Sequence, residues 1–232
     1  MFFFDIDGTL FDHQSAEKAG ALGFLEQRRR IINIPAERFL LLWSNLTEKY
    51  YQLYLEGNLS FGEQRRARIH ELYSLVGRTV TNEEADRAFH DFLTYYKRAW
   101  VAYPDVIPCL KELQNKNIGL GIISNGDFKQ QSDKLQHVGI RHFFSVFVTS
   151  GDVGYSKPDK RIFIEACARA NKEPGQCFYV GDLLDTDFVG STSAGMRGIL
   201  LNRQGIFLPS STDIPVVNNL AELIELLWDY GK

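Results

Sequence analysis

The chain has 232 residues and a formal net charge of −3, and 44% of its residues are hydrophobic and 13% aromatic. This apolar content is ordinary for a globular protein and excludes a mainly disordered chain. The slightly acidic balance leaves no overall basic surface, so we expect no nucleic-acid partner. No apolar run approaches the roughly 20 residues that cross a bilayer, so we expect no membrane span.

The cysteines and the first residues predict a location. Cys109, Cys167 and Cys177 are odd in number and form no C-x-x-C pair, so we expect buried thiols in a reducing compartment. The apolar start 1–4 stops at Asp5 and lacks a basic flank, which does not fit a signal peptide. We therefore expect a cytoplasmic protein, and its net charge is compatible with a monomer or a homodimer.

The first predicted element is a strand, because the apolar run 1–6 is short and Gly8 ends it. The stretch 14–98 then contains no convincing strand. It shows helical patterns at 16–29, 36–56, 61–76 and 83–98, with breaks at Gly57 and at Gly77. We expect this stretch to form an all-helical module inserted after the first strand.

Apolar runs and helical patterns alternate in the rest of the chain. Strands are predicted at 118–123, 146–148, 177–180 and 198–201, and helices at 106–115, 127–137, 159–170, 187–194 and 220–227. Near-continuous apolar strands alternating with helices are typical of a parallel sheet covered on both faces. The predicted fold class is therefore α/β, a doubly wound parallel sheet with an inserted helical module.

Polar residues follow four of the predicted strands, and the carboxyl ends of parallel strands meet at one edge of the sheet, where ligands bind. These residues are Asp5, Asp7, Ser124, Asn125, Lys157, Asp182, Asp185 and Asp187. Neighbouring carboxylates repel each other unless a cation joins them. An oxygen-only ligand set beside a phosphate favours Mg²⁺.

Each motif by itself also fits a structural role. Asp-x-Asp-Gly and Gly181-Asp182 fit turns after strands, Ser124-Asn125-Gly126 fits a helix start, and Lys157-Pro158-Asp159 fits a solvated helix start. Asp185 is expected to be a loop residue. The functional interpretation depends on all four motifs falling, in order, on successive strand ends.

In this order, Asp5-Ile6-Asp7-Gly8-Thr9-Leu10, Ser124-Asn125, Lys157-Pro158 and Gly181-Asp182 with Asp187 resemble the four motifs of the haloacid dehalogenase (HAD) superfamily. The resemblance runs from Asp5 to about Gly195 and implies a Rossmann-like core of residues 1–13 and 99–232. It also implies that the helical module, residues 14–98, is the cap that this family inserts between its first two motifs. The cap resembles those of pyrimidine nucleotidase-like and phosphoglycolate phosphatase-like members.

The resemblance implies a role for each matching residue. Asp5 would be the nucleophile that forms an aspartyl-phosphate, and Asp7 the acid that protonates the leaving alcohol and then activates water. Ser124 and Lys157 would also be catalytic. Phosphate-binding residues would be Gly8, Thr9, Ser124, Asn125 and Lys157. Mg²⁺ would be held by Asp5, the backbone carbonyl of Asp7, Asp182 and Asp187, the last directly or through water.

A Mg²⁺-dependent phosphatase for a small phosphorylated metabolite is the function we predict. Asp7 favours phosphate esters, because halide leaves without a proton and the family's dehalogenases do not carry an acid there. A nucleoside monophosphate is a plausible substrate, and phosphoglycolate and sugar phosphates are close rivals. A phosphomutase using the same aspartate and a non-catalytic metal or phosphate sensor stay open as alternatives.

The cap would select the substrate by closing over the site, with hinges near 12–15 and 96–103. The stretch Glu56–Phe61 resembles the cap loop that faces the substrate in similar proteins. Arg65, Arg66 and Arg68 follow it and are expected to form a solvated helix face. His13 comes soon after the first motif and is a candidate neighbour of the substrate.

Overall fold

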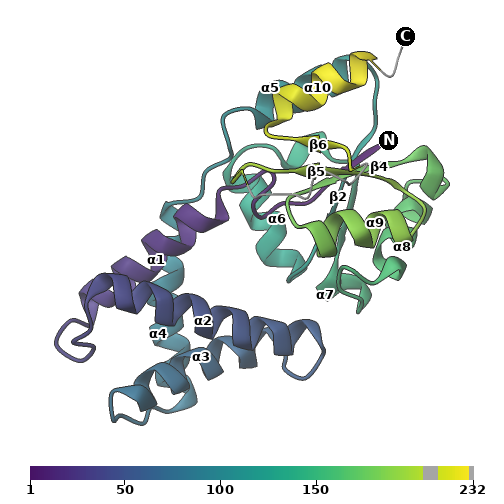
Figure 1. The fold of residues 1–232 in the computed structure, drawn as a ribbon. Coiled ribbons are helices and arrows are strands. Elements are labelled where there is room, and N and C mark those ends of the chain that lie inside the picture. Colours follow the sequence, from purple (N-terminus) through teal and green to yellow (C-terminus); the bar gives the residue numbers. More distant parts are fainter. Residues whose placement is uncertain (206–213, 230–232) are drawn as a thin grey trace. The chain divides into compact units, whose positions relative to one another are not determined.

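The computed structural model describes residues 1–205 and 214–229, without the side chains of 227–229. The chain forms two compact units, one of Met1–Asp12 with Val101–Lys232 and one of His13–Trp100 (Figure 1).

A six-stranded parallel sheet forms the centre of the first unit. Its strands are β1 (Phe2–Phe4), β2 (Leu120–Ser124), β3 (Val146–Thr149), β4 (Phe178–Gly181), β5 (Arg197–Leu201) and β6 (Val216–Val217), in the order β3-β2-β1-β4-β5-β6. Phe3 of β1 pairs with Gly121 of β2 and with Tyr179 of β4. The chain therefore leaves β1 between the ends of β2 and β4, which are the strands that lead to Ser124 and Asp182.

Helices cover both faces of this sheet. They are α5 (Val106–Asn115), α6 (Phe128–His137), α7 (Ser150–Val153), α8 (Lys160–Arg169), α9 (Gly190–Ser193) and α10 (Leu220–Asp229), with short 3-10 turns at Arg141–Phe143 and Pro174–Gln176. The strand order, together with the right-handed rule for crossovers between parallel strands, places α5 and α6 on one face and α8 and α9 on the other. Helices α5 and α10 lie side by side (Figure 1).

A buried cluster joins the sheet to α8. This cluster contains four fully buried side chains, those of Phe3, Val148, Phe163 and Tyr179. The rings of Phe163 and Tyr179 lie edge to face, with their centroids 5.1 Å apart. Gly121 has no side chain where the ring of Phe3 crosses β2, and a Cβ there would overlap that ring. Close packing of this kind keeps the strand ends in fixed positions.

The second unit consists of four helices: α1 (His13–Gln27), α2 (Ala36–Leu55), α3 (Phe61–Leu75) and α4 (Asn82–Arg98). Helix α1 packs on α4, and α2 packs on α3. Phe24, Trp43 and Phe92 form a buried aromatic core, with Trp43 only 4.6 Å from Phe92 between ring centroids. Capping boxes begin α3 at Ser60 and α4 at Thr81.

The predicted α/β class is confirmed, and the structure corrects several predicted elements. The helix expected at 187–194 is a π-helical turn, Leu184–Val189, followed by the short α9. Strand β6 and helix α7 were not expected, because elements of two and four residues are too short to show a hydrophobic period. The three cysteines are free and buried, as predicted.

The structure contains no helix, within residues 1–205 and 214–229, that is long and apolar enough to cross a membrane.

Candidate active site

Asp5 continues the central strand. Its backbone N–H donates to the carbonyl of Val180 at 2.9 Å, which extends the β1–β4 pairing by one residue. The chain then turns back, as the N–H of Leu10 donates to the carbonyl of Ile6 at 2.9 Å. Gly8 has a φ of +87°, and a Cβ there would overlap the carboxylate of Asp182, so this position requires glycine.

Three carboxylates meet beside this turn. One ligand atom from each of Asp5, Asp182 and Asp187 can be chosen so that all lie within 4.8 Å of one another. Asp187 is only 1% exposed, and its close approach to β4 depends on Gly181, where a Cβ would overlap its carboxylate. The π-helical turn carries Asp187 to this position, and the N–H of Leu183 donates to its Oδ2 at 3.0 Å.

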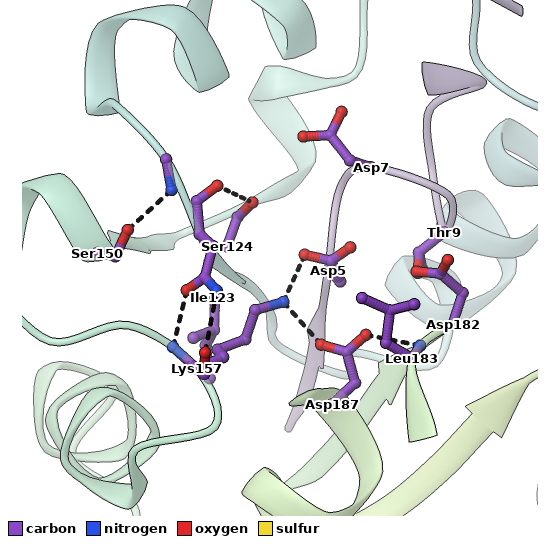
Figure 2. A network of polar contacts seen from close by, with 12 residues as sticks. Asp5, Asp7, Thr9, Ile123, Ser124, Ser150, Lys157, Asp182, Leu183 and Asp187 are labelled. Atoms are coloured by element: carbon purple, nitrogen blue, oxygen red, sulfur yellow. Dashed lines mark hydrogen bonds and ion pairs between the residues drawn. The ribbon is translucent and has the colours of Figure 1, made fainter. Parts of the chain in front are cut away.

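Lys157 supplies a buried positive charge to the carboxylates (Figure 2). Its Nζ lies 2.6 Å from Oδ1 of Asp5 and 2.7 Å from Oδ1 of Asp187. The lysine is 5% exposed, so water screens these ion pairs poorly. Lys157 thus bridges the end of β1 and the π-helical turn after β4.

Asn125 positions Lys157 through its side chain. Its Oδ1 accepts from the backbone N–H of Lys157 at 2.7 Å, and its Nδ2 donates to the carbonyl of Lys157 at 3.1 Å. The sequence predicted that Asn125 would bind phosphate, and the structure adds this two-point contact. Ser124 is 1% exposed, and its hydroxyl donates to the carbonyl of Asn125 at 3.2 Å.

Thr9 contacts a carboxylate as well. It is fully buried, and its hydroxyl donates to Oδ1 of Asp182 at 3.2 Å. The turn after β1 and the end of β4 are therefore linked through a predicted site residue. Asp185 is exposed, but it lies in the π-helical turn Leu184–Val189 and not in the loop that the sequence predicted.

Tyr179 also belongs to the site, although the sequence did not predict it. Its hydroxyl accepts from Nζ of Lys157 at 2.8 Å and lies 3.0 Å from both Oδ1 of Asp187 and the carbonyl of Ile123. The signal available was a phenol inside an otherwise apolar strand, three residues before Asp182. A buried phenol needs a polar partner, which here is the lysine.

Two more missed residues, Lys134 and Gln131, contact Asp7. Nζ of Lys134 lies 2.6 Å and 2.8 Å from the two carboxylate oxygens of Asp7, and Nε2 of Gln131 donates to Oδ2 at 2.8 Å. Figure 2 shows the carboxylate of Asp7 on the opposite side of Asp5 from Asp187. Asp7 thus lies beside the three clustered carboxylates but pairs with a different cation, the ammonium of Lys134.

The electrostatics of the carboxylates indicate a need for further positive charge. Burial raises the pKa of Asp5 to about 8, with repulsion from Asp187, Asp182 and Asp7 adding to it against the attraction of Lys157. Burial also raises the pKa of Asp182 to about 6. Burial would lower the pKa of Lys157, but Asp187 and Asp5 outweigh it, so this lysine stays charged. One ammonium thus faces three carboxylates, and this oxygen-only set fits a hard divalent cation.

In the helical unit, the structure corrects the prediction for the arginine run of α3. Arg68 is buried, and its Nη1 donates to the hydroxyl of Thr47 at 2.7 Å. Burial lowers its pKa to about 10. Arg65 and Arg66 are both half-exposed; Arg66 pairs with Asp86 at 2.7 Å, and the guanidinium of Arg65 lies over the ring of Phe61 at 4.0 Å.

His13 begins α1 in the same unit. Its Nδ1 lies 3.0 Å from the hydroxyl of Tyr96, and its Nε2 lies 3.6 Å from Glu17. These contacts place the imidazole against α4.

Comparisons with known proteins agree with this geometry. A family model described as haloacid dehalogenase-like hydrolase matches residues 1–195. The chain is 30% identical to glyceraldehyde 3-phosphate phosphatase of Methanothermobacter thermautotrophicus, over 97% of this chain and 98% of that protein. It is 25% identical to human N-acylneuraminate-9-phosphatase, over 97% and 92% of the two chains.

A solved structure shows the same fold. The HAD hydrolase YfnB of Bacillus subtilis, bound to magnesium, superposes with a TM-score of 0.80 at 23% identity, over 97% of each chain. The family model covers most of the sequence and includes the clustered charged residues Asp5, Lys157, Asp182 and Asp187. This chain therefore belongs to the haloacid dehalogenase-like hydrolases.

Proposed function

We propose that this chain is a Mg²⁺-dependent phosphatase that hydrolyses small phosphomonoesters through an aspartyl-phosphate on Asp5. The observation that carries the proposal is the position of Asp5. Asp5 directly follows the central strand, and Asp7, a second acid, comes two residues later. The carboxylate of Asp5 lies 2.6 Å from the buried ammonium of Lys157, and its ligand atom lies within 4.8 Å of those of two further carboxylates. The family match and the two full-length relatives that are named phosphatases support it.

In this proposal Asp5 is the nucleophile. Lys157 donates to its Oδ1, which leaves Oδ2 to attack phosphorus. A phosphorus–oxygen bond to Oδ2 forms while the bond from phosphorus to the ester oxygen breaks. The ammonium of Lys157 balances charge on the carboxylate and on the phosphoryl oxygens. The hydroxyl of Ser124 and the backbone N–H of Asn125 are proposed to bind the same oxygens.

Asp7 would carry the proton in both halves of the reaction. It protonates the ester oxygen as the alcohol leaves, and it then takes a proton from the water that attacks phosphorus. The second step releases inorganic phosphate and restores the carboxylate of Asp5. Proton transfer of this kind contributes about 10²–10⁴-fold to a rate.

The carboxylates of Asp5 and Asp182 and the backbone carbonyl of Asp7 would hold Mg²⁺. Both oxygens of Asp187 already accept hydrogen bonds, which favours contact with the ion through water. When bound, the ion would supply the positive charge that one lysine cannot provide to three carboxylates and a phosphate.

The substrate class follows from the site and the relatives together. Phosphatases named for glyceraldehyde 3-phosphate and for N-acylneuraminate 9-phosphate are similar over almost the whole chain. Small phosphorylated sugars and related metabolites are therefore the first substrates to test. Nucleoside monophosphates and phosphoglycolate stay predictions from the sequence.

The test is phosphate release from a panel of these esters, with Mg²⁺ and with EDTA. We expect release with Mg²⁺ only, and none from Asp5→Asn. Asp185→Asn is the matched control, because it changes an exposed aspartate of the same sheet edge and should keep activity. Isomer formation without phosphate release would indicate a phosphomutase, and no turnover by folded protein would indicate a sensor.

A further inference from the structure

A lysine is buried on the inner face of α6. Lys134 is 1% exposed, and its Nζ lies 2.6 Å and 2.8 Å from the two oxygens of Asp7. The same ammonium lies 5.1 Å from the ring centroid of Phe11, which is fully buried. Lysine is almost never fully buried unless it is paired, and here the pairing partner is the carboxylate of Asp7.

Gln131 lies one helical turn before Lys134, on the same face of α6. Its Nε2 lies 2.8 Å from Oδ2 of Asp7, 2.8 Å from the hydroxyl oxygen of Ser124 and 3.0 Å from the carbonyl of Asn125. Three acceptors around one nitrogen fix the orientation of the amide, because the opposite orientation would place its oxygen against a carboxylate. Gln131 thus links Asp7 to Ser124.

Stability alone does not explain this arrangement. Burying a lysine carries a desolvation cost, and well-packed apolar residues can often replace a buried ion pair without loss of stability. The oxygen Oε1 of Gln131 is also buried, and it has no hydrogen-bond partner in the part of the chain that the structure describes. An unsatisfied buried polar atom costs free energy. Burying these two side chains therefore costs free energy, and both of them contact Asp7, the acid proposed to protonate the leaving oxygen.

We propose that Lys134 and Gln131 are positioning residues that hold the carboxylate of Asp7, and through Gln131 the hydroxyl of Ser124, in place for leaving-group departure. Bonds to both oxygens fix both side-chain torsions of Asp7. One helix face thereby sets the distance between the proton carrier and a phosphate-binding hydroxyl. This inference rests on the proposed function.

Because Asp7 acts on the leaving oxygen, losing its position should affect esters according to their leaving groups. An alkyl phosphate needs its oxygen protonated, whereas p-nitrophenyl phosphate releases a stable phenolate without a proton. The second step needs Asp7 for both esters, since water must be activated in each case. The first and second steps therefore have to be measured separately.

The experiment is rapid-mixing kinetics of Lys134→Met with both esters and Mg²⁺. We expect the initial burst of p-nitrophenolate to keep its rate, while the steady state that follows slows and phosphoenzyme accumulates. With an alkyl phosphate, both the first step and the steady state should slow by about 10²-fold, the lower end of the range for lost proton transfer. The KM for the alkyl phosphate, whose two steps slow together, and the Mg²⁺ concentration for half activity should change little, whereas the KM for p-nitrophenyl phosphate should fall as phosphoenzyme accumulates.

Lys129→Met is the matched control. It makes the same substitution in the same helix, at a lysine whose side chain is 82% exposed and pairs with Asp133 at the surface. We expect unchanged kinetics for both esters. Lys134→Arg should recover part of the lost activity, since arginine can also donate to both oxygens of a carboxylate.

Two further variants keep the inference falsifiable if Lys134→Met does not fold. Gln131→Leu should give the same leaving-group dependence in a weaker form. Adding Lys134→Arg to Asp7→Asn should cost no more than Asp7→Asn alone, because the arginine can act only through Asp7.

An equal loss of the first-step rate with both esters, or no loss in either step with either ester, would overturn the inference. That result would leave the proposed function intact as long as Asp5→Asn abolishes turnover of the same esters. If wild-type protein turns over no ester, the proposed function fails first, and this inference fails with it.

Discussion

The hydroxyl of Tyr179 lies 2.8 Å from Nζ of Lys157, inside the sheet. The ammonium therefore has three fixed partners, since it also lies 2.6 Å from Asp5 and 2.7 Å from Asp187. Three contacts match the three hydrogens of a lysine ammonium. The phenol in β4 thus completes the set that holds the lysine beside the nucleophile.

Tyr179→Phe should weaken both stability and activity. The change removes a buried hydrogen bond to a charged group, which contributes about 1.5–3 kcal/mol. Urea unfolding should show a loss of this size, and kcat should fall because Lys157 has lost one of its three partners. Tyr155→Phe is the control at an exposed tyrosine of the same unit. Unchanged kcat in Tyr179→Phe would show that the other two contacts are sufficient.

Stability without metal should depend on pH. The pKa of Asp5 is raised to about 8 and that of Asp182 to about 6, both from 3.8, so the folded state favours their protonated forms. This contribution is complete below the unfolded value of 3.8 and is lost as pH rises toward about 8. With EDTA, the thermal midpoint should therefore be lower at about pH 9 than at about pH 6.

Saturating Mg²⁺ should reduce that difference, because the ion stabilises the ionised carboxylates and adds binding free energy to the folded state. Asp5→Asn should also reduce it in EDTA by removing the group with the larger shift. Thermal scans across this pH range, with and without metal, make the comparison. The same pH dependence in all three samples would contradict the prediction.

Gly181→Ala should damage the site without removing a functional group. A Cβ there would overlap the carboxylate of Asp187, so that side chain must move away from Lys157. Overpacking of this kind costs about 1–3 kcal/mol. We expect lower stability in urea and a large loss of kcat. Gly175→Ala, where a Cβ meets nothing within 4 Å, should leave both values near wild type.

Ser60→Ala should destabilise the helical unit. The hydroxyl of Ser60 accepts from the N–H of Glu63 at 3.2 Å, and the carboxylate of Glu63 accepts from the N–H of Ser60 at 2.8 Å. Losing such a cap costs about 0.5–2 kcal/mol. Urea unfolding followed by circular dichroism would measure it. Ser74→Ala, an exposed change inside the same helix, should cost nothing, and an equal effect from both would argue against a capping contribution.

Much of the fold could be predicted because its signals are local. The apolar runs that end at Ser124 and at Gly181 predicted parallel strands, and strand polarity alone then places Asp5, Ser124 and Asp182 at one edge. The two-residue strand β6 left no such signal, and the π-helical turn at Asp187 has no sequence period of its own.

The buried polar residues on helices and strands could not be predicted in the same way. Lys134 and Arg68 have charged neighbours in the sequence and fit solvated helix faces, yet both are buried. Their partners, Asp7 and Thr47, are 127 and 21 residues away along the chain. No local pattern reports a contact between such distant residues.

The sequence by itself determined the fold class, the family resemblance and the strand ends that carry the acids, because hydrophobic period and motif order are local properties of the chain. Only the tertiary structure decided which charges face one another: Lys157 with Asp5, Asp187 and Tyr179, and Lys134 with Asp7. The reason is physical. Burial strengthens an ion pair and penalises an unpaired charge, so the partners of each charge depend on packing between distant segments.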